Sequence, residues 1–140
     1  MSATALLILF AGIHVAQPAV PGQSAGDKFT VDVSKTTKAV KAGKKGQFVL
    51  QIKAAEGYKV SKDAPLKVKL ASEGVSLAKD RLKAKDATKK PFTSPTFKVP
   101  FKGKVPGDTS IAMDATFFVC DVQICERKTA KVSVPVSVRP

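Results

Sequence analysis

Short stretches in which apolar and polar residues alternate run through the chain from residue 29 to its end. A period of two is typical of β-strands with one buried face, because successive side chains point to opposite faces of a sheet. The pattern is clear in residues 29–33, 47–53, 66–70 and 97–101. These stretches predict a core-facing set made of Phe29, Val31, Val33, Phe48, Leu50, Ile52, Leu66, Val68, Leu70, Phe97, Val99 and Phe101.

The longest alternating stretches come last, at residues 110–120 and 129–139, and a short strand is expected at 75–77. Residues 56–65 break the pattern, and residues 79–90 are so rich in charge that an exposed loop is expected there. About seven short strands, separated by turn signals and without helical periodicity, indicate an all-β fold. The sequence therefore predicts an immunoglobulin-like antiparallel β-sandwich.

The N-terminal segment differs in character from the rest of the chain. Residues 3–16 are apolar, and no charged residue precedes Asp27. This stretch is too short to span a bilayer comfortably, but its length suits the apolar region of a secretory signal. We therefore expect a signal-like segment and spacer at residues 1–26 and the domain at 27–140. The mature chain is expected to be exported, with no stable membrane span; a mildly apolar tail is the alternative.

The chain is strongly basic, with 24 Lys and Arg against 11 Asp and Glu and a formal charge of +13. Its arginines are few: Arg81, Arg127 and Arg139. Proteins that recognise nucleic acids usually rely on arginine and stacked aromatic side chains. Here lysines alternate with apolar residues along the strands, which is typical of a solvated outer face that discourages pairing between sheet edges. No nucleic-acid partner is expected; attraction to an acidic partner or to an anionic envelope surface is the other alternative.

His14 is the only histidine, and it lies in the signal-like segment. A domain without histidine cannot hold a Ser-His-Asp or Cys-His catalytic arrangement, nor a Cys2His2 zinc site. Two thiolates suffice for a soft metal such as Cu(I), but Met113 is expected to face the core and no other soft ligand is placed to help. No glycine-rich phosphate loop occurs either. We expect neither a metal nor a cofactor.

Both cysteines, Cys120 and Cys125, fall at the end of a predicted hairpin between the two longest strands. Alternation places Ile111, Met113, Ala115, Phe117 and Val119 on the core side. Cys120 then lies on the polar outer face, together with Phe118. Counting back from the last strand places Cys125 on the same face, unless a bulge at residues 126–128 inverts it.

A disulfide between these cysteines closes only a short loop. Opposed residues of a hairpin lie within the distance that a disulfide can bridge. The loop entropy gives it about 2 kcal/mol of stabilisation, at the low end for disulfides. Short, outward-facing disulfides are those expected to exchange. Phe118 either shields the pair, contacts a partner, or is covered by another loop.

The hairpin at residues 115–125 resembles the cysteine hairpin of the N-terminal periplasmic domain of the thiol:disulfide interchange protein DsbD. Residues 57–66 (Gly-Tyr-Lys-Val-Ser-Lys-Asp-Ala-Pro-Leu) are similar to a Gly-Tyr-His-Ile-Asn segment of that family. The resemblance covers about residues 28–138 and implies an immunoglobulin-like domain of the bacterial envelope. It implies that Cys120 and Cys125 are the redox pair, with Cys125 in the mixed disulfide.

The resemblance also implies a partner: a thioredoxin-fold protein, a membrane thiol reductase, or both. The expected function is thus a module that passes electrons through the Cys120/Cys125 dithiol in the periplasm. The alternative is a non-catalytic immunoglobulin-like binding or structural domain with a static hairpin disulfide.

Overall fold

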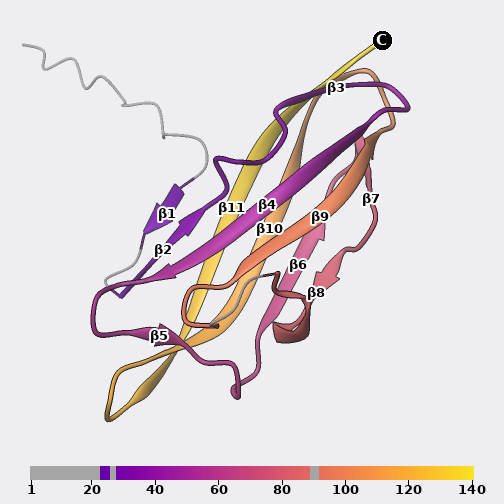
Figure 1. The fold of residues 1–140 in the computed structure, drawn as a ribbon. Coiled ribbons are helices and arrows are strands. Elements are labelled where there is room, and N and C mark those ends of the chain that lie inside the picture. Colours follow the sequence, from indigo (N-terminus) through magenta and orange to yellow (C-terminus); the bar gives the residue numbers. More distant parts are fainter. Residues whose placement is uncertain (1–22, 26–27, 89–91) are drawn as a thin grey trace, which may run out of the picture.

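Two β-sheets pack face to face in the computed structural model, which describes residues 23–25, 28–88 and 92–140 (Figure 1). The five-stranded sheet has the order β1 (Gln23–Ala25), β2 (Phe29–Asp32), β4 (Lys45–Ala54), β9 (Thr96–Gly103) and β7 (Val75–Leu77). The six-stranded sheet has the order β3 (Ala39–Lys41), β11 (Cys125–Arg139), β10 (Gly107–Cys120), β6 (Lys67–Ala71) and β8 (Arg81–Leu82), with β5 (Lys59–Val60) also on β10. A 3-10 helix spans Ala84–Asp86.

The predicted all-β sandwich of immunoglobulin-like type is confirmed. The pairings between the named strands are antiparallel, except that β3 runs parallel to β11. Several of the eleven strands in the described chain have only two or three residues. Alternation is not visible over so few residues, which is why it predicts fewer strands.

The core lies between the sheets and consists of the apolar faces that alternation predicts. Each of the twelve core-facing residues of the first four stretches is at most 6% exposed, and so are the core-side residues of β10. Phe117 packs edge-on against Phe29 of the other sheet, with ring centroids 5.0 Å apart. Edge-to-face packing is a preferred geometry for aromatic pairs and joins the two sheets near the hairpin end.

Two segments expected to be loops contribute strands. The charged stretch after residue 79 contains β8, whose Leu82 is 3% exposed and pairs with Val68. The expectation of an exposed loop is therefore wrong there, because a single apolar side chain suffices to fix a two-residue strand against β6. The segment after residue 56 contains β5, which pairs with the end of β10.

The predicted signal-like segment and His14 lie outside the described residues. Strand β1, at the end of the expected spacer, pairs with β2. In the part of the chain that the structure describes, no helix is long and apolar enough to cross a membrane.

Strands β10 and β11 form one long hairpin whose residues stay opposed from Gly107↔Val138 to Cys120↔Cys125. Its turn lies at the end of the domain opposite the C-terminus (Figure 1). On the other side of β10, β6 pairs with Ala112–Thr116 and β5 with Val119–Cys120. The hairpin is thus supported almost to its last residue, where the cysteines lie.

Candidate functional site

The two cysteines are the last opposed pair of the β10–β11 hairpin and form a disulfide. Their Cα atoms lie 4.0 Å apart. No bulge interrupts the register between Ala130 and Cys125, so both cysteines project from the outer face of the six-stranded sheet, as the parity of the strands predicts. In the described residues no cysteine is free.

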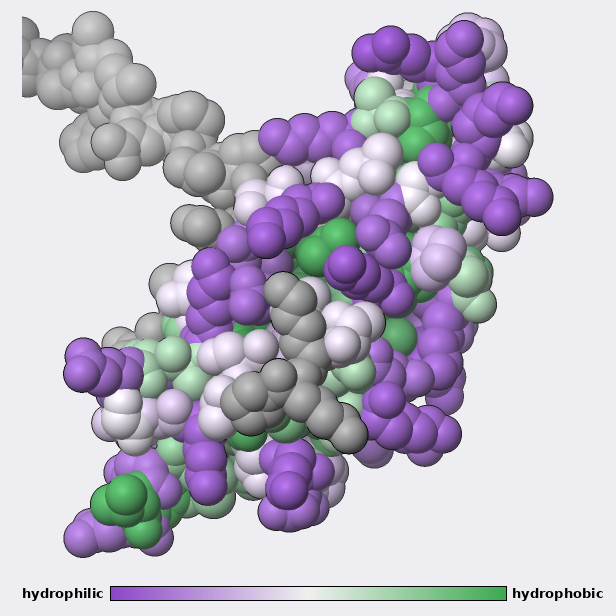
Figure 2. Space-filling view, viewed as in Figure 1, coloured by the Kyte–Doolittle hydropathy of each residue, from purple (hydrophilic) through white to green (hydrophobic). Residues whose placement is uncertain are grey.

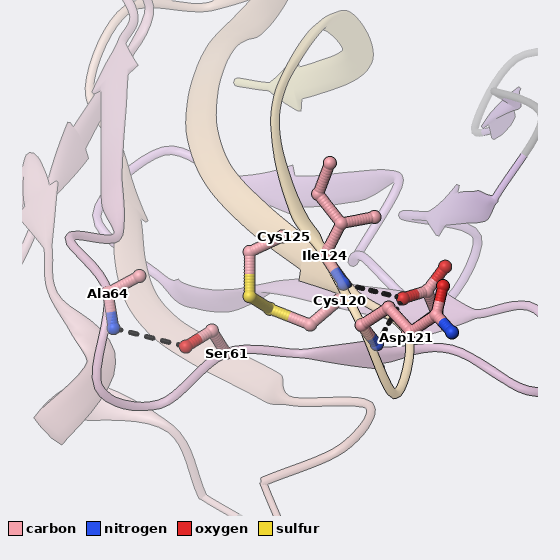
Figure 3. The surroundings of a disulfide bond; sticks show 7 residues. Ser61, Ala64, Cys120, Asp121, Ile124 and Cys125 are labelled. Carbon is pink, nitrogen blue, oxygen red and sulfur yellow. Dashed lines mark hydrogen bonds between the residues drawn. A yellow bond between two sulfur atoms is a disulfide. The ribbon is translucent and has the colours of Figure 1, made fainter.

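The two cysteines differ in accessibility. Cys125 is exposed, whereas Cys120 is only 4% exposed. Lys59 of β5 is opposed to Cys120. Just beyond β5, the Ser61 N–H donates a hydrogen bond to the Phe118 carbonyl at 2.9 Å, so this segment stays against β10. Ser61 and Ala64 lie beside the disulfide (Figure 3). Cys120 lies on the outer face of the sheet, as predicted. It is nevertheless inaccessible, because strand β5, which was not predicted, and the chain after it cover this side chain.

The four-residue turn between the cysteines is held by its own hydrogen bonds. The Asp121 Oδ1 atom accepts from the backbone N–H groups of Gln123 and Ile124, at 2.7 Å each (Figure 3). The Asp121 N–H donates to the Ile124 carbonyl at 3.0 Å. Because an aspartate that caps its own turn fixes the local backbone, the turn has hydrogen bonds that hold its shape in addition to the disulfide.

The same hydrogen bonds make the turn sensitive to acid. Those from Ile124 and Gln123 lower the pKa of Asp121 from its ordinary value of 3.8. A carboxylate with a lowered folded-state pKa stabilises the turn above the ordinary value, and this contribution is lost as the pH falls through the folded-state pKa. We expect the amide proton shifts of Gln123 and Ile124 in NMR spectra to titrate together below pH 3.8. Asp121→Asn keeps an acceptor oxygen and is expected to abolish this titration; its persistence would assign it to another group.

Two large apolar side chains project from the turn into solvent. Val122 is 98% exposed and Ile124 is 58% exposed. Among the described residues, Val105 is the other large apolar residue that is exposed. Figure 2 shows a hydrophobic patch at the end of the molecule where Figure 1 draws the hairpin turn. Sequence reasoning missed this patch, although its signal was present: turns favour polar residues, and two of the four turn positions are apolar.

On the core side of the hairpin, Glu126 is held by two lysines. Its carboxylate pairs with Lys28 and, at 3.0 Å, with Lys128. These hydrogen bonds lower the pKa of Glu126, and the bond to Glu126 raises the pKa of Lys28. The Lys28 ammonium also lies 5.4 Å from the centre of the Tyr58 ring. The negative charge next to Cys125 is thus compensated, which removes one obstacle to a thiolate there.

Phe118 lies on the outer face and is half-buried. It lines a hollow of about 440 Å³ with Pro65, Thr116 and Arg127 among its other walls. The segment after β5 therefore covers part of the ring and leaves part of it open. In the described residues, no group of three or more His, Cys, Asp or Glu side chains is placed to hold a metal ion.

Together, the fold and the site define a β-sandwich domain with a disulfide at the tip of its longest hairpin. No family model matches the chain. No curated protein matches it either.

Two solved structures are similar to the chain. Domains 4 and 5 of the S-layer protein SbsC match with 21% identity and a TM-score of 0.46, over 88% of this chain and 55% of that one. The yeast GGA1 GAE domain matches with 11% identity and a TM-score of 0.38, over 83% of this chain and 100% of that one. Similarities at this level establish no relationship of function.

Proposed function

We propose that the domain is a thiol–disulfide exchange module of the bacterial envelope, working through Cys120 and Cys125 with a thioredoxin-fold protein or a membrane thiol reductase. The observation that carries this proposal is the difference in exposure between the two cysteine residues. Cys125 is exposed beside the apolar side chains of Val122 and Ile124, and Cys120 is buried. An incoming thiolate therefore meets one sulfur and a hydrophobic contact surface next to it.

The exchange needs no cofactor. The partner's thiolate attacks the Cys125 sulfur, the bond between the two sulfurs breaks, and Cys120 leaves as a thiolate with the electron pair. A second thiolate on the partner then attacks the partner's own sulfur in the mixed disulfide and releases Cys125. The partner ends as a disulfide, having lost two electrons, and the domain ends as a dithiol. The reverse sequence oxidises the domain.

A purely stabilising role explains the site less well. The bond closes a loop of about six residues, which the chain-entropy relation values at about 2 kcal/mol. The hairpin is already held by its β-ladder and by the Asp121 hydrogen bonds. Such a clasp would add little to a turn that has hydrogen bonds of its own. Export to an oxidising compartment, which we propose with the function, lets the disulfide persist until a partner reduces it.

The proposal predicts that the two thiols react at different rates. With Cys120→Ser the remaining Cys125 is exposed, and with Cys125→Ser the remaining Cys120 is buried. We expect the first variant to react about tenfold or more faster with a thioredoxin whose active-site cysteine carries an aromatic leaving thiol and whose second cysteine is Ser, because a buried thiol reacts only after local opening. Mass spectrometry of the mixed disulfide measures both rates.

Equal rates for the two variants would contradict the assignment of Cys125 as the attacked sulfur. The reduction potential of the intact pair separates exchange from a static clasp. A value above about −300 mV is expected, whereas a lower one would establish the alternative of a non-catalytic domain with a structural disulfide.

A further inference from the structure

On the outer face of the six-stranded sheet, opposed residues of neighbouring strands form rows, and the disulfide is part of the first row. The register places the rows as Cys125–Cys120–Lys59, Arg127–Phe118, Thr129–Thr116–Lys67 and Lys131–Asp114–Lys69–Arg81. Side chains of opposed residues share a face. The cysteines therefore form one end of a surface that runs along the hairpin. We call the residues with positive charge on it the basic face: Lys59, Lys67, Lys69, Arg81, Arg127 and Lys131.

The charges of the basic face are largely uncompensated. Its six cations are exposed, and one carboxylate, Asp114, lies among them. Lys131 reaches Asp114 at 3.9 Å. In the described residues, Lys59, Lys67, Lys69 and Arg127 make no ion pair within 4.0 Å. On the core side of the hairpin the opposite holds, since both lysines there are paired with Glu126.

The surface is also hollowed where these charges lie. The hollow of about 440 Å³ beside Phe118 has Lys67, Lys69 and Arg127 in its wall. A second hollow of about 570 Å³ adjoins it through Lys69 and Asp114 and has the small residues Ala71, Ala112 and Ser133 in its wall. Two adjoining shallow hollows with small residues in one, positive side chains in their walls and an aromatic side chain at one end fit an extended chain.

We propose that the basic face docks an acidic, extended segment of the protein whose thiol attacks Cys125. This inference rests on the proposed exchange function and names what its partner must present: carboxylate side chains near the thiol. Glutamates or aspartates of the segment pair with Lys67, Lys69 and Arg127, and an apolar side chain of the segment packs on Phe118. Complementary charge of this kind mainly raises the rate of encounter and fixes the register of docking.

Other polyanions fit the face less well. Arginine forks and stacked aromatic side chains are the usual means of holding nucleic acid, and the face has four lysines against two arginines and a single, half-buried phenylalanine. A membrane surface binds protruding cations, whereas these lysines line the two hollows. A protein thiol that attacks the disulfide must approach the end of the face where Cys125 is exposed, which nucleic acid or lipid need not do.

The test compares three thiol peptides of the pattern Cys-Gly-X-Thr-X-Thr-X, in which X is Glu, Gln or Lys. Rates of reduction of the oxidised domain are normalised to the thiolate concentration of each peptide. At low ionic strength we expect the Glu peptide to react about tenfold faster than the Gln peptide and the Lys peptide to be slowest, with the differences falling as salt is added. The triple variant Lys67→Gln, Lys69→Gln, Arg127→Gln is expected to bring all three rates within about twofold of one another.

The matched control removes the same charge at the other end of the domain, with Lys41→Gln, Lys44→Gln and Lys45→Gln, which are also exposed. This control is expected to keep the preference for the Glu peptide. Equal rates for the three peptides with the unaltered domain would overturn the docking proposal and leave exchange standing. If no peptide reduces the disulfide, the proposed exchange function is overturned. Binding is then tested by NMR with the Glu peptide carrying Ser in place of Cys: shift changes around Phe118 support docking of an acidic segment, and their absence overturns it.

Vesicles of phosphatidylglycerol test the other occupant. Both triple variants are expected to lose vesicle binding equally, because such binding follows overall charge. Selective loss in the variant of the basic face, without any peptide preference, would assign the face to a membrane and overturn the proposal.

Discussion

Replacing Phe117 with alanine is expected to lower the free energy of unfolding by about 3–5 kcal/mol, the range for truncating a fully buried aromatic side chain. Phe117 is 0% exposed and packs edge-on against Phe29 of the opposite sheet. Its removal leaves a cavity at the point where the hairpin is joined to the five-stranded sheet. Urea denaturation followed by circular dichroism measures the loss as a lower transition midpoint with an unchanged slope.

The neighbouring residue provides the matched control. Phe118 has the same side chain on the other face of β10 and is half-buried. Phe118→Ala is expected to cost about 1 kcal/mol, because much less apolar area returns to water. Equal losses for the two variants would contradict the orientation of the strand. The control also separates two roles of Phe118. If Phe118 is a shield, its loss speeds modification by a small neutral thiol; if it contacts a partner, its loss slows reaction with thioredoxin and leaves the rate with the small thiol unchanged.

Alternation alone was enough to predict the sandwich and the faces of its strands. A strand of eight or more residues repeats its period several times, and one slip would move its whole apolar set to the solvent. The core side of β10 and the outward parity of both cysteines followed from this rule. The same rule gives the outer face of β10 as the alternate residues from Ala112 to Cys120.

Accessibility could not be predicted in the same way. Whether Cys120 is open to solvent depends on β5, a two-residue strand that lies sixty residues away in sequence and whose position is fixed by pairing. Two residues carry no period, and the segment's turn-like composition gave no sign of an edge partner. The burial of Leu82 in β8 has the same cause. The difference in exposure between Cys120 and Cys125, which the proposed function depends on, is thus a property of tertiary pairing.

The basic face could not be predicted from the sequence for a related reason. Each strand shows its own alternating lysines, but register decides which of them stand in one row. Lys67 and Lys69 lie beside Thr116 and Asp114 because β6 pairs with β10 in one register; a shift by two residues would have kept every predicted face and altered every row. The sequence suggested a solvated lysine surface, and pairing concentrates part of it next to the disulfide.

Threonine side chains extend the five-stranded sheet where β2 ends. Strand β2 ends at Asp32, opposite Gln51 of β4, and residues 36–37 then lie beside the earlier part of β4, where the Thr37 N–H donates to the Gln47 carbonyl at 2.9 Å. The Thr36 Oγ1 atom accepts from the Val49 N–H at 3.0 Å and donates to the Val49 carbonyl at 3.2 Å. Further along, the Gln47 N–H donates to the Thr37 Oγ1 atom at 3.0 Å. Two hydroxyl groups and one backbone hydrogen bond therefore continue the pairing of β4 beyond the end of β2.

We expect Thr36→Val to lower the free energy of unfolding by about 2–4 kcal/mol, because the variant keeps the shape of the side chain but leaves two buried backbone groups of Val49 without a partner. Thr36 is 4% exposed and Val49 7% exposed, so water cannot replace the hydroxyl. Thr37→Val is the control: its partner Gln47 is exposed, and a loss below about 1 kcal/mol is expected because water can accept that hydrogen bond. Urea denaturation measures both values, and hydrogen exchange at the Val49 amide locates the effect. A loss for Thr36→Val no larger than that for Thr37→Val would show that the hydroxyl does not continue the pairing of β4, and the edge of the sheet next to Val49 would then have to be held by side-chain packing alone.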